Sequence, residues 1–118
     1  MLLPEAVLIN GQTGSISPET GRYTKRLSEL RQIFQDRTAL ETMVSERNDP
    51  IIYEVLEYKK EGSDLFFGTT IMEPGTVGEE FFMTRGHFHK RRDMGEIYYT
   101  QSGHGVLLLE SRDGRSEV

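Results

Sequence analysis

Residues 86–109 read GHFHKRRDMGEIYYTQSGHGVLLL, and they carry the densest structural and chemical signal in the chain. Two histidines, His87 and His89, are separated by one residue, so on a β-strand both imidazoles project from the same face. Glu96 follows after six intervening residues, which is enough chain for a turn and a return along the adjacent strand. The spacing therefore predicts that two imidazoles and one carboxylate face one another.

Such a donor set suits a divalent transition ion with open coordination positions. The alternative for His87 and His89 is a plain solvated pair, and for Glu96 an ordinary exposed carboxylate. His104 lies between two glycines and is expected to be a turn residue rather than a ligand. The sequence contains no cysteine, so disulfides, thiolate metal sites and a thiol nucleophile are excluded.

The sequence around this stretch is typical of short antiparallel strands. Segments rich in β-branched and aromatic residues are each bounded by turn residues, without the alternation of strands and helices that builds a parallel sheet. The expected strands are 51–58, 65–72, 79–85, 96–101 and 105–110, and the expected turns are 61–64, 73–75, 102–105 and 112–114. The pattern predicts an all-β barrel or sandwich.

The N-terminal part has a different pattern. Residues 1–23 contain frequent glycines and prolines, which indicates an extended arm with a turn or two. Residues 24–48 have helical spacing, with Leu27, Leu30, Ile33 and Phe34 on one face. Asp36 is the expected cap of a second short helix with Leu40, Met43 and Val44 inside, and 48–50 close it. The chain is thus interpreted as a single domain, 1–118, with barrel strands in 50–118.

Composition limits the classes of partner. With 36% hydrophobic and 28% charged residues the chain is expected to fold. A net charge of −5 argues against a nucleic-acid surface. No apolar run approaches the roughly 20 residues of a membrane helix, so we expect no membrane partner and a cytoplasmic location. The turn at 112–114 is expected to lead into a strand, yet the sequence stops at Val118. Either a partner chain covers the open edges or the sequence is incomplete.

The stretch from Thr69 to Leu109 resembles the first cupin motif. The matching residues are Pro74-Gly75, Gly78, Phe81-Phe82, Thr84, Gly86-His87-Phe88-His89, Gly95-Glu96-Ile97-Tyr98 and 103–108. More narrowly, the chain is similar to the cupin-type phosphoglucose isomerases first recognised in archaea, because general cupins have a shorter gap between the second histidine and the glutamate. The resemblance implies an antiparallel cupin β-barrel, or jelly roll. It also shows that the second cupin motif, with a further histidine, is missing.

The resemblance implies a function and a set of site residues. The reaction would be the interconversion of glucose 6-phosphate and fructose 6-phosphate, in glycolysis and gluconeogenesis, by a homodimer. The metal, iron by preference or else manganese, nickel or zinc, would lie on His87, His89 and Glu96. Glu96 would also be the catalytic group, either as a base in a cis-enediol route or as a ligand only in a hydride shift. The substrate-binding residues would be Thr70, Thr84, Gly86, Tyr53 and Tyr98.

Two other functions remain open on this sequence. One is another cupin enzyme, a small-molecule isomerase or a dioxygenase, that uses the same His and Glu ligands. The other is a non-catalytic, sugar-binding cupin module that lacks activity because the second motif is missing.

Overall fold

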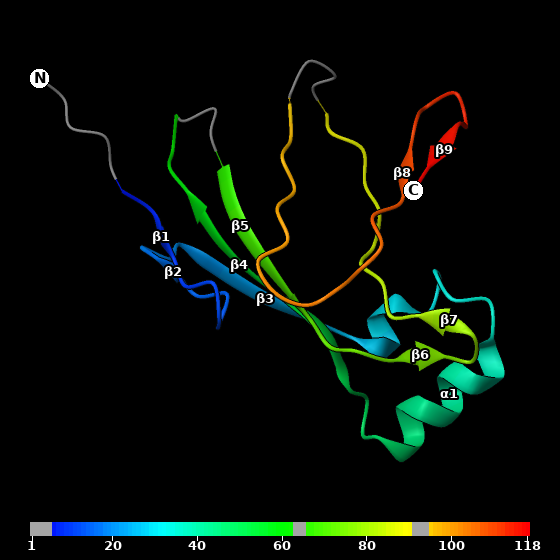
Figure 1. The fold of residues 1–118 in the computed structure, drawn as a ribbon. Helices are drawn as coiled ribbons and strands as arrows, with labels where there is room; N and C mark the ends of the chain where they lie inside the picture. Colours follow the sequence, from blue (N-terminus) through cyan, green and yellow to red (C-terminus); the bar gives the residue numbers. More distant parts are fainter. Residues whose placement is uncertain (1–5, 63–65, 91–94) are drawn as a thin grey trace, which may run out of the picture.

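The computed structural model describes residues 6–62, 66–90 and 95–118. Within these ranges the chain is mostly strands, joined in antiparallel pairs, with a single α-helix (Figure 1). None of the described helices is long and apolar enough to cross a membrane. The predicted strand start at Leu65, parts of the turns at 61–64 and 90–95, and the first apolar residues of the arm lie outside the described residues.

A three-stranded antiparallel sheet forms the centre, in the order β3 (Gly21–Arg26), β4 (Ile51–Lys59) and β5 (Phe66–Met72). Strand β4 lies in the middle and is buried at most of its positions. In the register, Val55 pairs with Tyr23 on one side and with Thr70 on the other. Because side chains alternate along a strand, Tyr53, Val55 and Thr70 share one face of the sheet.

The main core lies at the end of the sheet where the helical segment packs. The 3₁₀ turn η1 (Leu27–Leu30), helix α1 (Arg37–Glu46) and the hairpin of β6 (Thr76–Val77) and β7 (Glu80–Phe81) surround it (Figure 1). Its buried residues are Leu27, Leu30, Phe34, Leu40, Ile52, Tyr53, Val55 and Val77. Met43 and Val44 pack against this cluster, so the predicted inner face of the helix is confirmed.

Helix α1 begins where the sequence predicted. The Asp36 carboxylate accepts a hydrogen bond of 2.9 Å from the backbone N–H of Ala39, which satisfies one of the free donors of the first turn. The helical segment is nevertheless shorter than predicted. Residues 24–26 belong to strand β3, because they pair with β4. Between Leu27 and Phe34 the chain forms a 3₁₀ turn and a bend rather than one regular helix, although the predicted apolar residues point into the core.

The predicted arm folds back on its own sheet. Strands β1 (Leu8–Ile9) and β2 (Ile16–Ser17) form a hairpin, and Ile16 packs with Leu56 and Tyr58 in a second cluster. The arm prediction for 1–23 was too long, since Gly21 already begins strand β3. The face that carries Leu56 is therefore covered by the hairpin.

The strand predictions for the second half were largely wrong. The segment 79–85 is strand only at β7, the segment 96–101 has no strand, and the segment 105–110 pairs only at β8 (Leu109–Glu110). The turn at 112–114 is confirmed, since it joins β8 to β9 (Ser116–Glu117). Without ladder partners these segments stay single, and the described sheets do not close into a barrel.

Candidate metal centre

Three predicted ligands lie together in the described structure. His87 and His89 follow β7 in a segment that pairs with no strand, and Glu96 lies in the next described segment of the chain. One ligand atom from each residue lies within 4.8 Å of the others. Within the described ranges this is the single group of three or more such side chains that could hold a metal ion.

The geometry of the three side chains fits a divalent ion. The Nε2 atom of His89 lies 3.0 Å from the Oε2 atom of Glu96. Two donors each about 2.1 Å from one ion, at a right angle or slightly more, are separated by about 3 Å. The imidazole of His87 stacks on that of His89, with 5.3 Å between the ring centroids and 22° between the planes. A ring nitrogen of His87 lies within 4.8 Å of the ligand atoms of the other two residues.

Tyr98 adds to this cluster from the same segment as Glu96. Partial burial of the phenol raises the pKa of Tyr98, and the hydrogen bond and negative charge of Glu96 raise it further. A phenol that donates to a carboxylate holds its own proton more tightly, because ionisation would place two negative charges together. Tyr98 therefore remains a proton donor beside Glu96 at neutral pH.

Arg112 contacts the histidine segment, and no sequence pattern predicted this contact. Its NH2 group donates a hydrogen bond of 3.1 Å to the backbone carbonyl of His89. Its guanidinium carbon lies 5.2 Å from the centroid of the Phe88 ring. The residue belongs to the β8–β9 turn, 23 positions along the chain from His89, so no local pattern could have indicated the contact.

The remaining predicted site residues lie apart from these contacts. Thr70 is exposed on β5, and Thr84 and Gly86 are exposed in the segment that leads to His87. His104 is also exposed and lies outside this cluster, next to a bend at residues 102–103. The structure thus brings the three predicted ligands and Tyr98 together, and leaves the two threonines at open surfaces.

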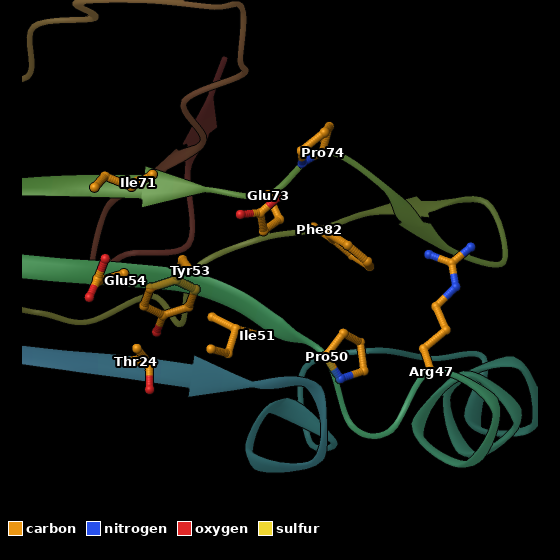
Figure 2. A pocket seen from close by; sticks show the side chains of 10 residues that line it. All are labelled: Thr24, Arg47, Pro50, Ile51, Tyr53, Glu54, Ile71, Glu73, Pro74 and Phe82. Carbon is orange, nitrogen blue, oxygen red and sulfur yellow. The ribbon is translucent and has the colours of Figure 1, made fainter. Parts of the chain in front are cut away.

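Tyr53 is buried and lines a separate cavity. This cavity has a volume of about 440 Å³ and lies where β4 begins and β5 ends, beside the end of helix α1. In Figure 2 the ring of Phe82 lies between the Glu73 and Arg47 side chains, above Pro50. None of the three metal ligands lines it. The histidine cluster is the candidate metal centre, because donor geometry identifies such a centre better than the size of a cavity does.

Comparison with known proteins agrees with the sequence resemblance. The family model for glucose-6-phosphate isomerase (GPI) matches residues 24–118. A glucose-6-phosphate isomerase of Sinorhizobium medicae is 44% identical over 117 residues, which cover 98% of this chain and 55% of that protein. The glucose-6-phosphate isomerase of Thermococcus gammatolerans is 42% identical over 116 residues, 97% of this chain and 60% of that protein.

A third relative extends the same result. The glucose-6-phosphate isomerase of Thermococcus litoralis is 39% identical over 115 residues, which cover 96% of this chain and 60% of that protein. The chain therefore spans little more than half the length of these relatives while nearly all of its own residues match. On the family model and these identities, the chain belongs to the cupin-type glucose-6-phosphate isomerase family.

Proposed function

We propose that this chain contributes the metal centre of an enzyme that interconverts glucose 6-phosphate and fructose 6-phosphate. The observation that carries the proposal is the convergence of His87, His89 and Glu96, whose ligand atoms lie within 4.8 Å of one another. Family membership supplies the reaction, since the curated relatives are named glucose-6-phosphate isomerase. The metal, iron by preference with manganese, nickel or zinc as alternatives, suits two imidazoles and a carboxylate.

The reaction moves a hydrogen between C1 and C2 of the sugar and a proton between the two oxygens. A bound divalent ion would polarise the carbonyl oxygen of the substrate. In a cis-enediol route Glu96 takes the proton from one carbon and returns it to the other, which requires its carboxylate to be ionised. The phenol of Tyr98 lies beside that carboxylate and would help to orient it.

In a hydride-shift route Glu96 remains a ligand and removes no proton from carbon. The two routes differ in the fate of the hydrogen, which exchanges with solvent deuterium only if a base carries it. The contact between Glu96 and His89 supports either role, because a carboxylate oxygen 3.0 Å from an imidazole nitrogen is placed to bind the same ion. Measurement of deuterium at C1 and C2 after turnover in D₂O separates them.

The substrate would approach from the face that carries Thr70, Tyr53 and the segment of Thr84 and Gly86. Hydroxyl groups and a backbone N–H are suitable donors for a phosphate. Closure of the antiparallel strands into a cupin barrel, or jelly roll, would bring these residues toward the histidines. We further propose a homodimer, and work in glycolysis and gluconeogenesis in the cytoplasm, as the family assignment implies.

A second function is favoured by one observation, the placement of the two threonines. Thr70 and Thr84 lie at open surfaces, outside the cluster of His87, His89 and Glu96. The alternative is a cupin module that binds metal or sugar without turnover. Metal content and isomerisation, measured on the same preparation, distinguish the two.

The first prediction concerns the ligands. Replacing His87 or His89 with Ala should lower bound transition metal by about tenfold or more, because two donors hold a divalent ion far less tightly than three. The matched control is His104→Ala, which should leave metal content unchanged, since His104 lies outside the cluster. Elemental analysis after dialysis against a chelator is the measurement. Equal metal content in the wild type and in all three variants would contradict the assignment of His87 and His89 as ligands.

A further inference from the structure

The histidine segment is held by few contacts of its own. Among the described residues, neither 86–89 nor the segment of Glu96 joins a strand ladder, so no sheet hydrogen bond described there fixes the ligands. Three donors that meet at one ion must be held to within about half an ångström. Some other part of the molecule must therefore restrain the backbone of His87 to His89.

The β8–β9 hairpin contacts this segment, and Figure 1 shows the two side by side. Its turn is closed by a backbone hydrogen bond of 2.8 Å from Ser111 to Arg115, and by one of 2.9 Å from Gly114 to Ser111. The side chain of Arg115 also donates to Asp113 at 3.0 Å, but this ion pair is exposed to solvent and adds little to the two backbone hydrogen bonds. The hairpin is thus held by its own hydrogen bonds and can restrain a segment that it contacts.

Arg112 connects this unit to the ligands in two ways. It donates to the carbonyl of His89, the backbone of a ligand itself, at 3.1 Å. It also covers the ring of Phe88 at 5.2 Å, which is cation–π distance. Phe88 lies between the two histidines in the sequence, and in extended chain its side chain points to the opposite face. Arg112 therefore contacts the segment on the face opposite the imidazoles, which remain free to bind a metal ion.

From this geometry we infer that Arg112 is a positioning residue for the metal centre, acting through the backbone of His89 and the ring of Phe88. The inference rests on the proposed function, since it concerns the same centre. Arg112 contacts no proposed ligand atom and takes no part in proton transfer. Its role is to hold His89 at the distance from Glu96 that the structure shows, 3.0 Å between nitrogen and oxygen.

The test compares Arg112→Met, Arg112→Lys and Arg115→Met in the full chain. Met keeps the length of the side chain and removes its charge and donors. Lys keeps the charge and one possible hydrogen bond. Arg115→Met is the matched control, because Arg115 lies in the same hairpin but pairs with Asp113 instead of the histidine segment. The probe is Co²⁺ alone, followed by its absorption spectrum and by competition with a chelator.

We expect Arg112→Met to weaken Co²⁺ binding by about tenfold, as loss of groups that orient metal ligands does, and to change the ligand-field bands. Arg112→Lys should restore most of the affinity, and Arg115→Met should match the wild type. In the metal-free protein, amide hydrogen exchange at residues 87–89 should become several-fold faster in Arg112→Met, because local opening is easier.

Three outcomes would overturn the inference. In the first, Arg112→Met has the same Co²⁺ affinity, absorption spectrum and amide exchange rate as the wild type. In the second, Arg115→Met loses as much Co²⁺ affinity as Arg112→Met does. In the third, Arg112→Lys restores none of the lost Co²⁺ affinity. Failure of the proposed function is a different result. In that case wild type binds no Co²⁺, while the exchange experiment on metal-free protein still reports whether Arg112 restrains the segment.

Discussion

Asp49 lies at the corner between helix α1 and strand β4, and its backbone is left-handed, with φ of 52°. Its carboxylate accepts hydrogen bonds from Ser28, from the backbone N–H at 2.8 Å and from the hydroxyl at 2.7 Å. Burial alone would raise the pKa of Asp49, but these two hydrogen bonds, with the charges of Arg26 and Arg31, outweigh it and lower the pKa. The corner is therefore stabilised by an ionised side chain.

Asp49→Asn should lower the free energy of unfolding by about 1–2 kcal/mol at neutral pH, the usual worth of hydrogen bonds to a charged group. Asn also tolerates a left-handed backbone, so the variant changes the charge and not the turn. Because the folded pKa is lowered, the contribution is present above the unfolded pKa, about 3.9, and is lost as pH falls through the folded pKa. Denaturation curves from pH 7 down to 3 measure this.

The Ser28→Ala background supplies the control for that experiment. Once the two donors of Ser28 are reduced to one, the cost of Asp49→Asn should shrink, as the coupling of direct partners requires. A difference between wild type and Asp49→Asn that is constant across the whole pH range would contradict the assignment to charge.

At this scale the sequence predicted which three side chains lie together, His87, His89 and Glu96, and missed the contacts of Arg112 with their segment. The spacing of His87 and His89 and the length of chain before Glu96 predicted this approach, although the strand expected at Glu96 does not form. Arg112 could not be predicted, because its partners are a backbone carbonyl and a ring far along the chain. The placement of Thr70 and Thr84 relative to the histidines depends on strand pairing, which single residues do not encode.

Among the elements, the start of helix α1 is coupled to the β6–β7 hairpin by one side chain. The carboxylate of Glu80 in β7 accepts hydrogen bonds from the backbone N–H groups of Gln35, at 2.8 Å, and of Asp36, at 3.2 Å. These donors precede the helix and have no acceptor within it. Helix α1 was predictable because its cap and apolar face are local, whereas the link to β7 spans 44–45 residues.

Glu80→Ala should lower the free energy of unfolding by about 1 kcal/mol, because water replaces the charged acceptor of two exposed backbone donors. Glu79→Ala is the matched control. Glu79 is an exposed neighbour in the β6–β7 turn, and its substitution should change stability by less than about 0.5 kcal/mol. Urea denaturation followed by circular dichroism gives both values. Equal losses in the two variants would show that the hairpin, and not the link to the helix, determines the effect.

The elements that sequence reasoning predicted wrongly share a physical cause. Residues 96–101 and 105–110 have the composition of strands, but a strand is stable only when its backbone groups pair with a neighbour. Strand β4 has a neighbour on each side and forms over its full predicted length. The later segments have none among the described residues, apart from the short β8–β9 pair. Strand propensity therefore identified these segments but could not show whether a neighbouring strand pairs with them.

Over the whole molecule, apolar surface is distributed unevenly. The first half buries its large side chains in two clusters around β4. In the second half Ile97 is 93% exposed, Tyr99 83% and Val106 73%, which is unusual for three large side chains in strand-like sequence. Such surface is covered when neighbouring strands close over it, and the relatives contain further chain beyond the matched length.

The last prediction follows from this exposed surface. A chimaera that continues Val118 with the unmatched remainder of the Sinorhizobium medicae relative should bury these side chains and pair the single segments. Metal binding should be present in both forms, since three ligands suffice to hold a divalent ion, but weaker in the short chain. Isomerisation should be about a hundredfold faster in the chimaera, because misplacement of the substrate by about an ångström costs that much in rate. A coupled assay of glucose 6-phosphate formed from fructose 6-phosphate, with each protein loaded with the same metal, measures the ratio. The chimaera carrying His89→Ala controls for activity that does not use the proposed centre. Equal rates in the short chain and the chimaera would mean that the 118-residue chain already positions the substrate, alone or with a second copy of itself.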